Sequence, residues 1–143
     1  PMYTLRSTHV ASSLLRSTYH PLFEQYGVDL VLQGHNHNYQ RTYPIKFNST
    51  SPKHPIETST NKTIYTDPDD RGGQIFATVG TGGAKLAPFK DQKEKEKYYY
   101  VKDYVGFGIL NVDITNNGKT LTGKFYANNN INGKIIDQFT ILK

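Results

Sequence analysis

A helical pattern that runs directly into an apolar strand is the feature that most restricts the fold of this chain. Apolar side chains recur at near-helical spacing between residues 10 and 26. Pro21 interrupts this pattern and predicts a kink or two short helices. Gly27 stands where a helix ends, and the run VDLVL follows at residues 28–32. The continuous apolar character of that run predicts a buried strand, and the short connection favours an α/β layered fold.

Length and charge exclude several classes of protein. The chain has 143 residues, which suits one domain, and no cysteine, which excludes disulfides and thiolate metal sites. Its formal net charge is +5, but the densest charged run, residues 90–97, alternates in sign as a solvated surface does. No apolar run approaches the roughly 20 residues of a membrane span. We therefore expect neither a nucleic-acid nor a membrane partner.

The rest of the chain has a long loop and a strand-rich C-terminal half. Residues 44–73 contain four prolines and many Ser and Thr, and are expected to form a long loop. Further strands are expected at residues 74–79, 105–114, 120–127 and 135–142. The sequence NNG at residues 116–118 is a strong hairpin signal between two of them. This half is therefore predicted to be an antiparallel β meander.

The sharpest chemical feature is the pair His35 and His37, which follows Gly34 at the end of the expected buried strand. On an extended backbone, residues two apart point the same way, so both imidazoles address one metal ion or two adjacent ions. Imidazole binds zinc, iron, copper and nickel alike, and the ligand type does not choose among them. The alternative is a pair of surface histidines in a loop.

The surrounding sequence resembles a known motif. Residues 34–44 read GHNHNYQRTYP and closely resemble the motif GHxHxYERxxP of purple acid phosphatases, members of the calcineurin-like metallophosphoesterase superfamily. Residues 26–33 resemble the helix-to-strand lead into that motif, residues 79–84 its glycine-rich strand end, and the final hairpin its last strands. The resemblance covers essentially residues 1–143 and implies part of a metallophosphoesterase α/β sandwich.

The resemblance implies a hydrolase in which two metal ions activate a hydroxide, acting on phosphoesters, most simply phosphomonoesters. Carried over, His35 binds the divalent ion and His37 the other, so that the pair is iron with zinc, manganese or iron. His9 falls at the position of a histidine that faces the phosphate, and it is a candidate for substrate binding or general acid catalysis. Taken alone, His9 reads as a capping or surface residue. An extracellular or cell-surface location follows from the resemblance only.

The acidic motifs that complete the family site do not occur in this sequence. The family's Asp, Asp-x-x-Asp and Asn-His motifs belong to an N-terminal half, so we expect this chain to be the C-terminal part of the domain. We expect it to bind metal weakly, to be inactive alone, and to need the missing half. Apolar faces left unpaired by that half make a homodimer a second possibility.

Four further side chains carry separate expectations. Arg41 either binds phosphate in a bidentate manner or belongs to the frame behind the histidines. Gln40 replaces the usual Glu, and this change is expected to weaken pairing with Arg41. His20 and His54 have no support from a motif; His20 is expected to face solvent and His54 to lie in the long loop.

Two other functions compete with hydrolysis. A non-catalytic binding or scaffold domain would keep the phosphoesterase fold without its site, and the upstream acidic motifs would discriminate between the two. A secreted carbohydrate-binding β module would explain the Asn-rich turns and the 11 tyrosines. The helix–strand unit at residues 10–33 argues against that module.

Overall fold

Two four-stranded sheets, a two-stranded sheet and one helix form the framework of the described part of the chain. The computed structural model describes residues 1–5, 7–67, 72–90, 98–128 and 133–143. The elements, in chain order, are α1 (Ser13–Gln25), β1 (Leu30–Gln33), β2 (Tyr39–Thr42), β3 (Ile45–Lys46), β4 (Ile56–Glu57), β5 (Ile64–Thr66), β6 (Ile75–Val79), β7 (Tyr100–Tyr104), β8 (Gly108–Thr115), β9 (Thr120–Ala127) and β10 (Lys134–Leu142). The architecture is thus mostly β, with a single helix in the described part, and it confirms the expected α/β sandwich half only in part.

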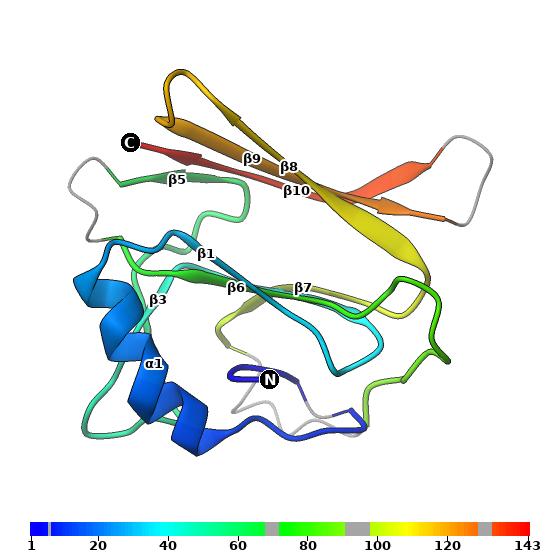
Figure 1. Cartoon of the computed structure of the whole chain (residues 1–143), viewed down its shortest axis with the longest axis horizontal. Helices are drawn as coiled ribbons and strands as arrows, with labels where there is room; N and C mark the ends of the chain where they lie inside the picture. The colour runs from blue at the N-terminus through cyan, green and yellow to red at the C-terminus, as the bar shows by residue number, and fades with distance from the viewer. Residues whose placement is uncertain (6, 68–71, 91–97, 129–132) are drawn as a thin grey trace.

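The elements form three layers. The first sheet has the strand order β1-β6-β2-β7, and the second has the order β5-β10-β9-β8. The two sheets lie face to face, with α1 on the outer side of the first (Figure 1). Because β1 pairs in parallel with β6, the carboxyl ends of both strands lie at the same end of the first sheet. The predicted antiparallel meander is present as β8, β9 and β10.

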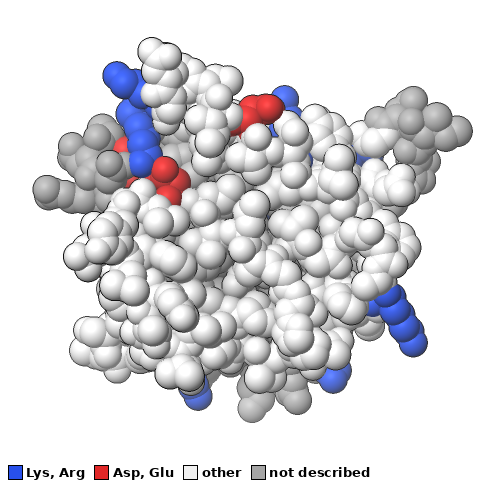
Figure 2. All heavy atoms as spheres, viewed as in Figure 1, with Lys and Arg blue, Asp and Glu red and all other residues white. Residues whose placement is uncertain are grey.

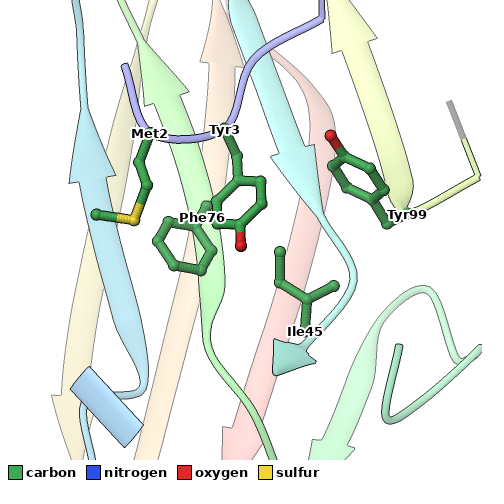
Figure 3. Packing of buried hydrophobic residues seen from close by; sticks show 5 residues of the cluster. All are labelled: Met2, Tyr3, Ile45, Phe76 and Tyr99. Carbon is green, nitrogen blue, oxygen red and sulfur yellow. The ribbon is translucent and has the colours of Figure 1, made fainter. Parts of the chain in front are cut away.

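The central strand β6 is buried and supplies side chains to both of its faces. Phe76 packs with Met2, Tyr3, Ile45 and Tyr99 in a cluster on one face of the first sheet (Figure 3). On the other face, a second cluster joins the two sheets and contains Tyr65, Ile75, Phe139 and Ile141. The segment before α1, which we call the N-terminal arm, therefore belongs to the core, since its Tyr3 is fully buried. Burial of a single large apolar side chain stabilises the fold by roughly 1.5–3 kcal/mol.

The helix buries a different face from the one that its apolar pattern predicts. Ser12 caps its N-terminus by accepting a hydrogen bond from the Leu15 amide, and the helix continues through Pro21 to Gln25. It is therefore one helix and not two. Its buried side chains are polar and belong to Arg16 and His20.

Most apolar side chains of this segment instead remain exposed, although Phe23 is half-buried against the first core cluster. We call this stripe the α1 apolar stripe, and its members are Val10, Leu14, Leu15, Tyr19, Leu22 and Tyr26.

The expectation that His20 faces solvent is wrong, because its side chain is 0% exposed. Its Nε2 lies 3.0 Å from Gln74 Oε1 and 3.3 Å from the Ile45 carbonyl, so this nitrogen carries the proton. Its Nδ1 then accepts from the Tyr3 hydroxyl at 2.8 Å. These partners are distant in sequence and together replace the water that a surface histidine would bind.

Burial lowers the pKa of His20 from its ordinary value of 6.5, although Glu24 opposes the shift. The unfolded chain therefore takes up a proton before the folded chain does as the pH falls. We expect full stability above about pH 6.5 and a loss of up to about 1.4 kcal/mol per pH unit as the pH falls toward the folded pKa. Urea unfolding at pH 7.5 and pH 5 would measure it. An unchanged pH slope in His20→Gln would contradict this assignment.

Two further expectations are corrected by the structure. The first strand lies at an edge of its sheet, and Leu32 is 57% exposed, so it is not a buried strand. The segment 44–73, expected to be loop throughout, carries the short strands β3, β4 and β5. The hairpin at residues 116–118 is as expected, with positive φ at all three residues.

Charged side chains do not gather on the face viewed in Figure 2. Lys and Arg stand apart near the edges of that face, and a few acidic side chains lie close to them. The alternating run at residues 90–97 lies almost wholly outside the described residues. Within the described part of the chain, no helix has the length and apolarity needed to cross a membrane.

Candidate metal and phosphate site

The two motif histidines lie in a short loop between β1 and β2. This histidine loop, residues 34–38, leaves the first sheet at the carboxyl end of β1. The carboxyl end of the parallel strand β6 lies at the same edge. Ligands bind at such edges in open α/β sheets. The chain thus places its candidate ligands where the topology favours a site.

The backbone of the histidine loop is not extended as expected. His35 has φ of 74°, in the left-handed region that non-glycine residues seldom adopt. Such strained backbone is often found at functional sites. The simple argument that residues two apart share a side therefore does not describe this loop. His35 is exposed, Asn36 is buried between the two histidines, and His37 is half-buried.

His9 comes from the N-terminal arm and meets His35 directly. The two imidazole rings are stacked, with centroids 3.6 Å apart and planes inclined by 21°. Partial desolvation lowers the pKa of His9, and the nearby charges of His35 and His37 lower it further. These three histidines therefore form one electrostatic cluster, although 26 positions separate the arm from the loop.

His37 is held in one ring orientation by a backbone carbonyl. Its Nδ1 lies 2.8 Å from the Lys85 carbonyl oxygen, which can only accept, so Nδ1 carries the proton. The opposite nitrogen, Nε2, is then left with its lone pair. Metal-bound histidines usually donate their second ring N–H in this way, which fixes the tautomer and the ring. No sequence pattern indicates this role of Lys85, because its contribution is made by the main chain.

The end of β6 packs against the histidine loop without space for a side chain. A Cβ atom on Gly80 would lie 2.0 Å from the Asn36 carbonyl oxygen and 3.1 Å from the Cα of His37. Both contacts are with backbone, which cannot move aside cheaply. Gly82, two residues later, has no atom within 4 Å of such a Cβ.

We expect Gly80→Ala to destabilise the chain by about 1–3 kcal/mol and to displace the histidine loop, because overpacking forces the backbone apart. Gly82→Ala is the matched control and is expected to stay within about 0.5 kcal/mol of the wild type. Urea unfolding measures the first effect, and amide NMR shifts of residues 34–38 measure the second. Equal stability of the two variants would refute the packing argument.

Gln40 and Arg41 of β2, for which the change from Glu to Gln predicts a weakened pairing, point to opposite faces of the sheet. Arg41 is fully buried and forms a bidentate pair with Asp137 of β10 at 2.6 and 2.8 Å. Gln40 points to the other face and accepts from the Leu5 amide at 2.6 Å. Neighbouring residues of a strand face opposite sides, so Gln40 cannot weaken the pairing of Arg41. Arg41 belongs to the frame and holds the two sheets together, and it is not free to bind phosphate.

The donor set of the site is partial. Among the described residues, no group of three or more His, Cys, Asp or Glu is arranged to hold a metal ion. His35 and His37 offer two imidazoles of the kind that zinc and iron accept, and His37 has the tautomer that a ligand needs. The described residues therefore offer two of the ligands that a metal site needs, and these two fit only part of such a site.

Comparisons with known proteins give a consistent family. No family model matches the chain. It is 32% identical over 133 residues to "Probable inactive purple acid phosphatase 1" of Arabidopsis thaliana, covering 93% of this chain and 19% of that protein. It is 26% identical over 117 residues to a purple acid phosphatase of Glycine max, covering 81% of this chain and 24% of that one.

A solved structure agrees with these relatives. The purple acid phosphatase PPD1 from yellow lupin superposes with a TM-score of 0.68 at 27% identity, over 85% of this chain and 19% of that one. The chain is purple acid phosphatase-like, because these relatives and this structural neighbour are purple acid phosphatases.

This purple acid phosphatase-like chain spans about a fifth to a quarter of the length of these relatives, and it fits the C-terminal part of the superfamily. GAP50, described as the anchor in the inner membrane complex of Plasmodium, shares its fold with a TM-score of 0.64 at 18% identity. Phosphoester hydrolysis is the activity that the names of several relatives carry.

Proposed function

We propose that the chain supplies the histidine part of a two-metal site that hydrolyses phosphoesters, with phosphomonoesters as the simplest substrate. The observation that carries the proposal is the tautomer of His37, whose Nδ1–H is committed to the Lys85 carbonyl 2.8 Å away. This arrangement leaves Nε2 as the one ring nitrogen able to bind a cation. A surface histidine with no such role has no need of a fixed tautomer.

His35 and His37 are the residues that would hold the two ions, which in this proposal are iron with zinc, manganese or iron. Bound there, the ions supply a water of lowered pKa and a clamp for the phosphate oxygens. The remaining ligands come from carboxylate and amide side chains outside this chain. Gly80 and the Lys85 carbonyl keep the histidine loop in place from the β6 side.

In this proposal, His9 is the side chain nearest the substrate. Its ring lies 3.6 Å from that of His35, so a phosphate beside His35 would also reach His9. An imidazole can donate a hydrogen bond to a phosphate oxygen or give a proton to the leaving oxygen. His9 is therefore proposed as the substrate-binding or general acid residue, and His35 and His37 as ligands.

We expect the 143-residue chain alone to have no useful phosphatase activity, because two imidazoles leave most of a two-metal site unfilled. The assay is p-nitrophenyl phosphate hydrolysis with iron and zinc present. A complete purple acid phosphatase assayed in parallel serves as the positive control, and metal salts without protein as the blank. Turnover by the chain comparable to that of the complete enzyme would contradict this expectation.

A non-catalytic scaffold is the second candidate. Two observations favour it: a relative named as probably inactive, and the shared fold with a protein described as an anchor. The two functions predict different sequence motifs in the rest of the gene product. Asp, Asp-x-x-Asp and Asn-His motifs there would support hydrolysis, and their replacement would support the scaffold.

The exposed α1 apolar stripe indicates that another protein segment covers this side of the helix. Tyr26 is 76% exposed, and the neighbouring edge strand β1 exposes Leu32 as well. We propose that the N-terminal half of the domain covers this face and pairs with the edge of β1. A homodimer of the isolated chain would use the same surface. Light scattering that shows only monomer over a wide concentration range would argue against the homodimer.

An extracellular or cell-surface location is proposed on the strength of the family alone. Plant purple acid phosphatases are among the relatives of the chain. Fractionation of the source cells with an antibody to this chain tests the proposal. Detection only in the cytosolic fraction would contradict it.

A further inference from the structure

We propose that Asn36 is the positioning residue that holds His9 against His35. Its side chain is 0% exposed and lies between the two motif histidines in sequence. Its Oδ1 accepts from the His9 amide at 2.9 Å, and its Nδ2 donates to the His9 carbonyl at 3.0 Å. One side chain thus binds both main-chain polar groups of His9.

This double contact fixes the orientation of His9 and not merely its distance. Two hydrogen bonds to the same residue, one donated and one accepted, hold its N–H and C=O in one direction, as a neighbouring strand would. The Nδ2 of Asn36 also donates to Thr4 Oγ1 at 2.6 Å, which ties the beginning of the arm to the same point. The imidazole of His9 is then set on the ring of His35 at 3.6 Å.

The neighbouring Asn38 shows that burial alone does not produce this effect. Asn38 is also fully buried, and it binds Ser7 Oγ at 3.1 Å and the Ala87 carbonyl at 3.0 Å. It secures the arm and the segment after β6 but does not contact His9 in these bonds. The two asparagines are therefore a matched pair, equal in type and burial and different in what they hold.

The catalytic meaning of this contact rests on the proposed function. A proton donor must keep a fixed place relative to the phosphate, and a misplacement of 1 Å can cost about 10²-fold in rate. Among the described residues of the arm that carries His9, none before Ser13 belongs to a helix or strand. Its order at His9 is supplied by the side chain of Asn36.

The test uses the metal-free 143-residue chain, so it needs no activity. In Asn36→Ala we expect hydrogen exchange at the His9 amide to accelerate at least tenfold, relative to the Phe139 amide of β10 in the same sample. The His9 ring NMR signals should also lose the shift caused by stacking on His35. Asn38→Ala should leave both readouts unchanged.

If Asn36→Ala fails to fold, Asn36→Asp keeps the acceptor for the His9 amide and loses both donors. The amide should then stay protected while the ring signals move.

The outcomes separate this inference from the proposed function. Unchanged His9 exchange and ring signals in a folded Asn36→Ala or Asn36→Asp chain would overturn the role of Asn36, whatever the metal does. Failure of Zn²⁺ to bind the wild-type chain through His35 and His37 would instead count against the proposed function. The NMR result on His9 would stand in that case.

Discussion

Replacing Arg41 with alanine is expected to lower the free energy of unfolding by about 3–5 kcal/mol, because it leaves a buried carboxylate without its partner. Arg41 bridges the two sheets. It binds both carboxylate oxygens of Asp137, and also donates to Tyr65 Oη at 2.7 Å and to the Lys62 carbonyl at 2.9 Å. Tyr39 adds a donated bond to Asp137 at 2.7 Å. Removal of the guanidinium takes two donated bonds from Asp137, which keeps only the Tyr39 bond among those described, and one each from Tyr65 and the Lys62 carbonyl.

Two controls sharpen this prediction, and urea unfolding measures all three variants. The ion pair between Lys143 and Asp29 is partly exposed, with side chains 24% and 25% accessible, so Lys143→Ala should cost less than about 1 kcal/mol. The double variant Arg41→Met with Asp137→Leu removes both charges and should lose less than Arg41→Ala alone. A loss below 1 kcal/mol in Arg41→Ala would show that this pair does not hold the sheets together.

The second large effect concerns the complete gene product. If it hydrolyses p-nitrophenyl phosphate, His35→Ala and His37→Ala should each lower its activity at least about hundredfold, because loss of a ligand exceeds the 10–100-fold cost of losing an outer-shell partner. His54→Ala is the control, since that ring contacts Ser51 in a loop instead of the site. Activity retained in both site variants would exclude these histidines as ligands.

Local chemistry explains which parts of the fold could be predicted. The β8–β9 hairpin follows from the NNG turn, whose three residues all have positive φ. Strand β6 follows from its short apolar run and is buried as expected. Both features depend on neighbours in sequence, and no distant partner decides them.

The errors arise where distant residues decide the outcome. The helix buries His20 because Tyr3 and Gln74 satisfy both of its ring nitrogens, and neither partner is near it in sequence. Arg41 finds Asp137 across 96 positions, on a strand of the other sheet. Periodicity cannot reveal such pairs.

The candidate site shows the same division. His35 and His37 are visible as a motif, and His9 is a candidate only through the family resemblance. The stack of His9 on His35 is a tertiary contact, so spacing alone would have left His9 a surface residue. No sequence pattern indicates the role of Asn36, because it occupies the variable position of the motif and acts only through His9.

The most direct test of the central claim is a Zn²⁺ titration of the chain itself by calorimetry. We expect weak but saturable binding of Zn²⁺ to the wild type, because two imidazoles are present without their carboxylate partners. We expect loss of that binding in both His35→Ala and His37→Ala, and unchanged binding in His54→Ala. Binding that survives in both site variants, or no binding to the wild type, would contradict the assignment of His35 and His37 as metal ligands.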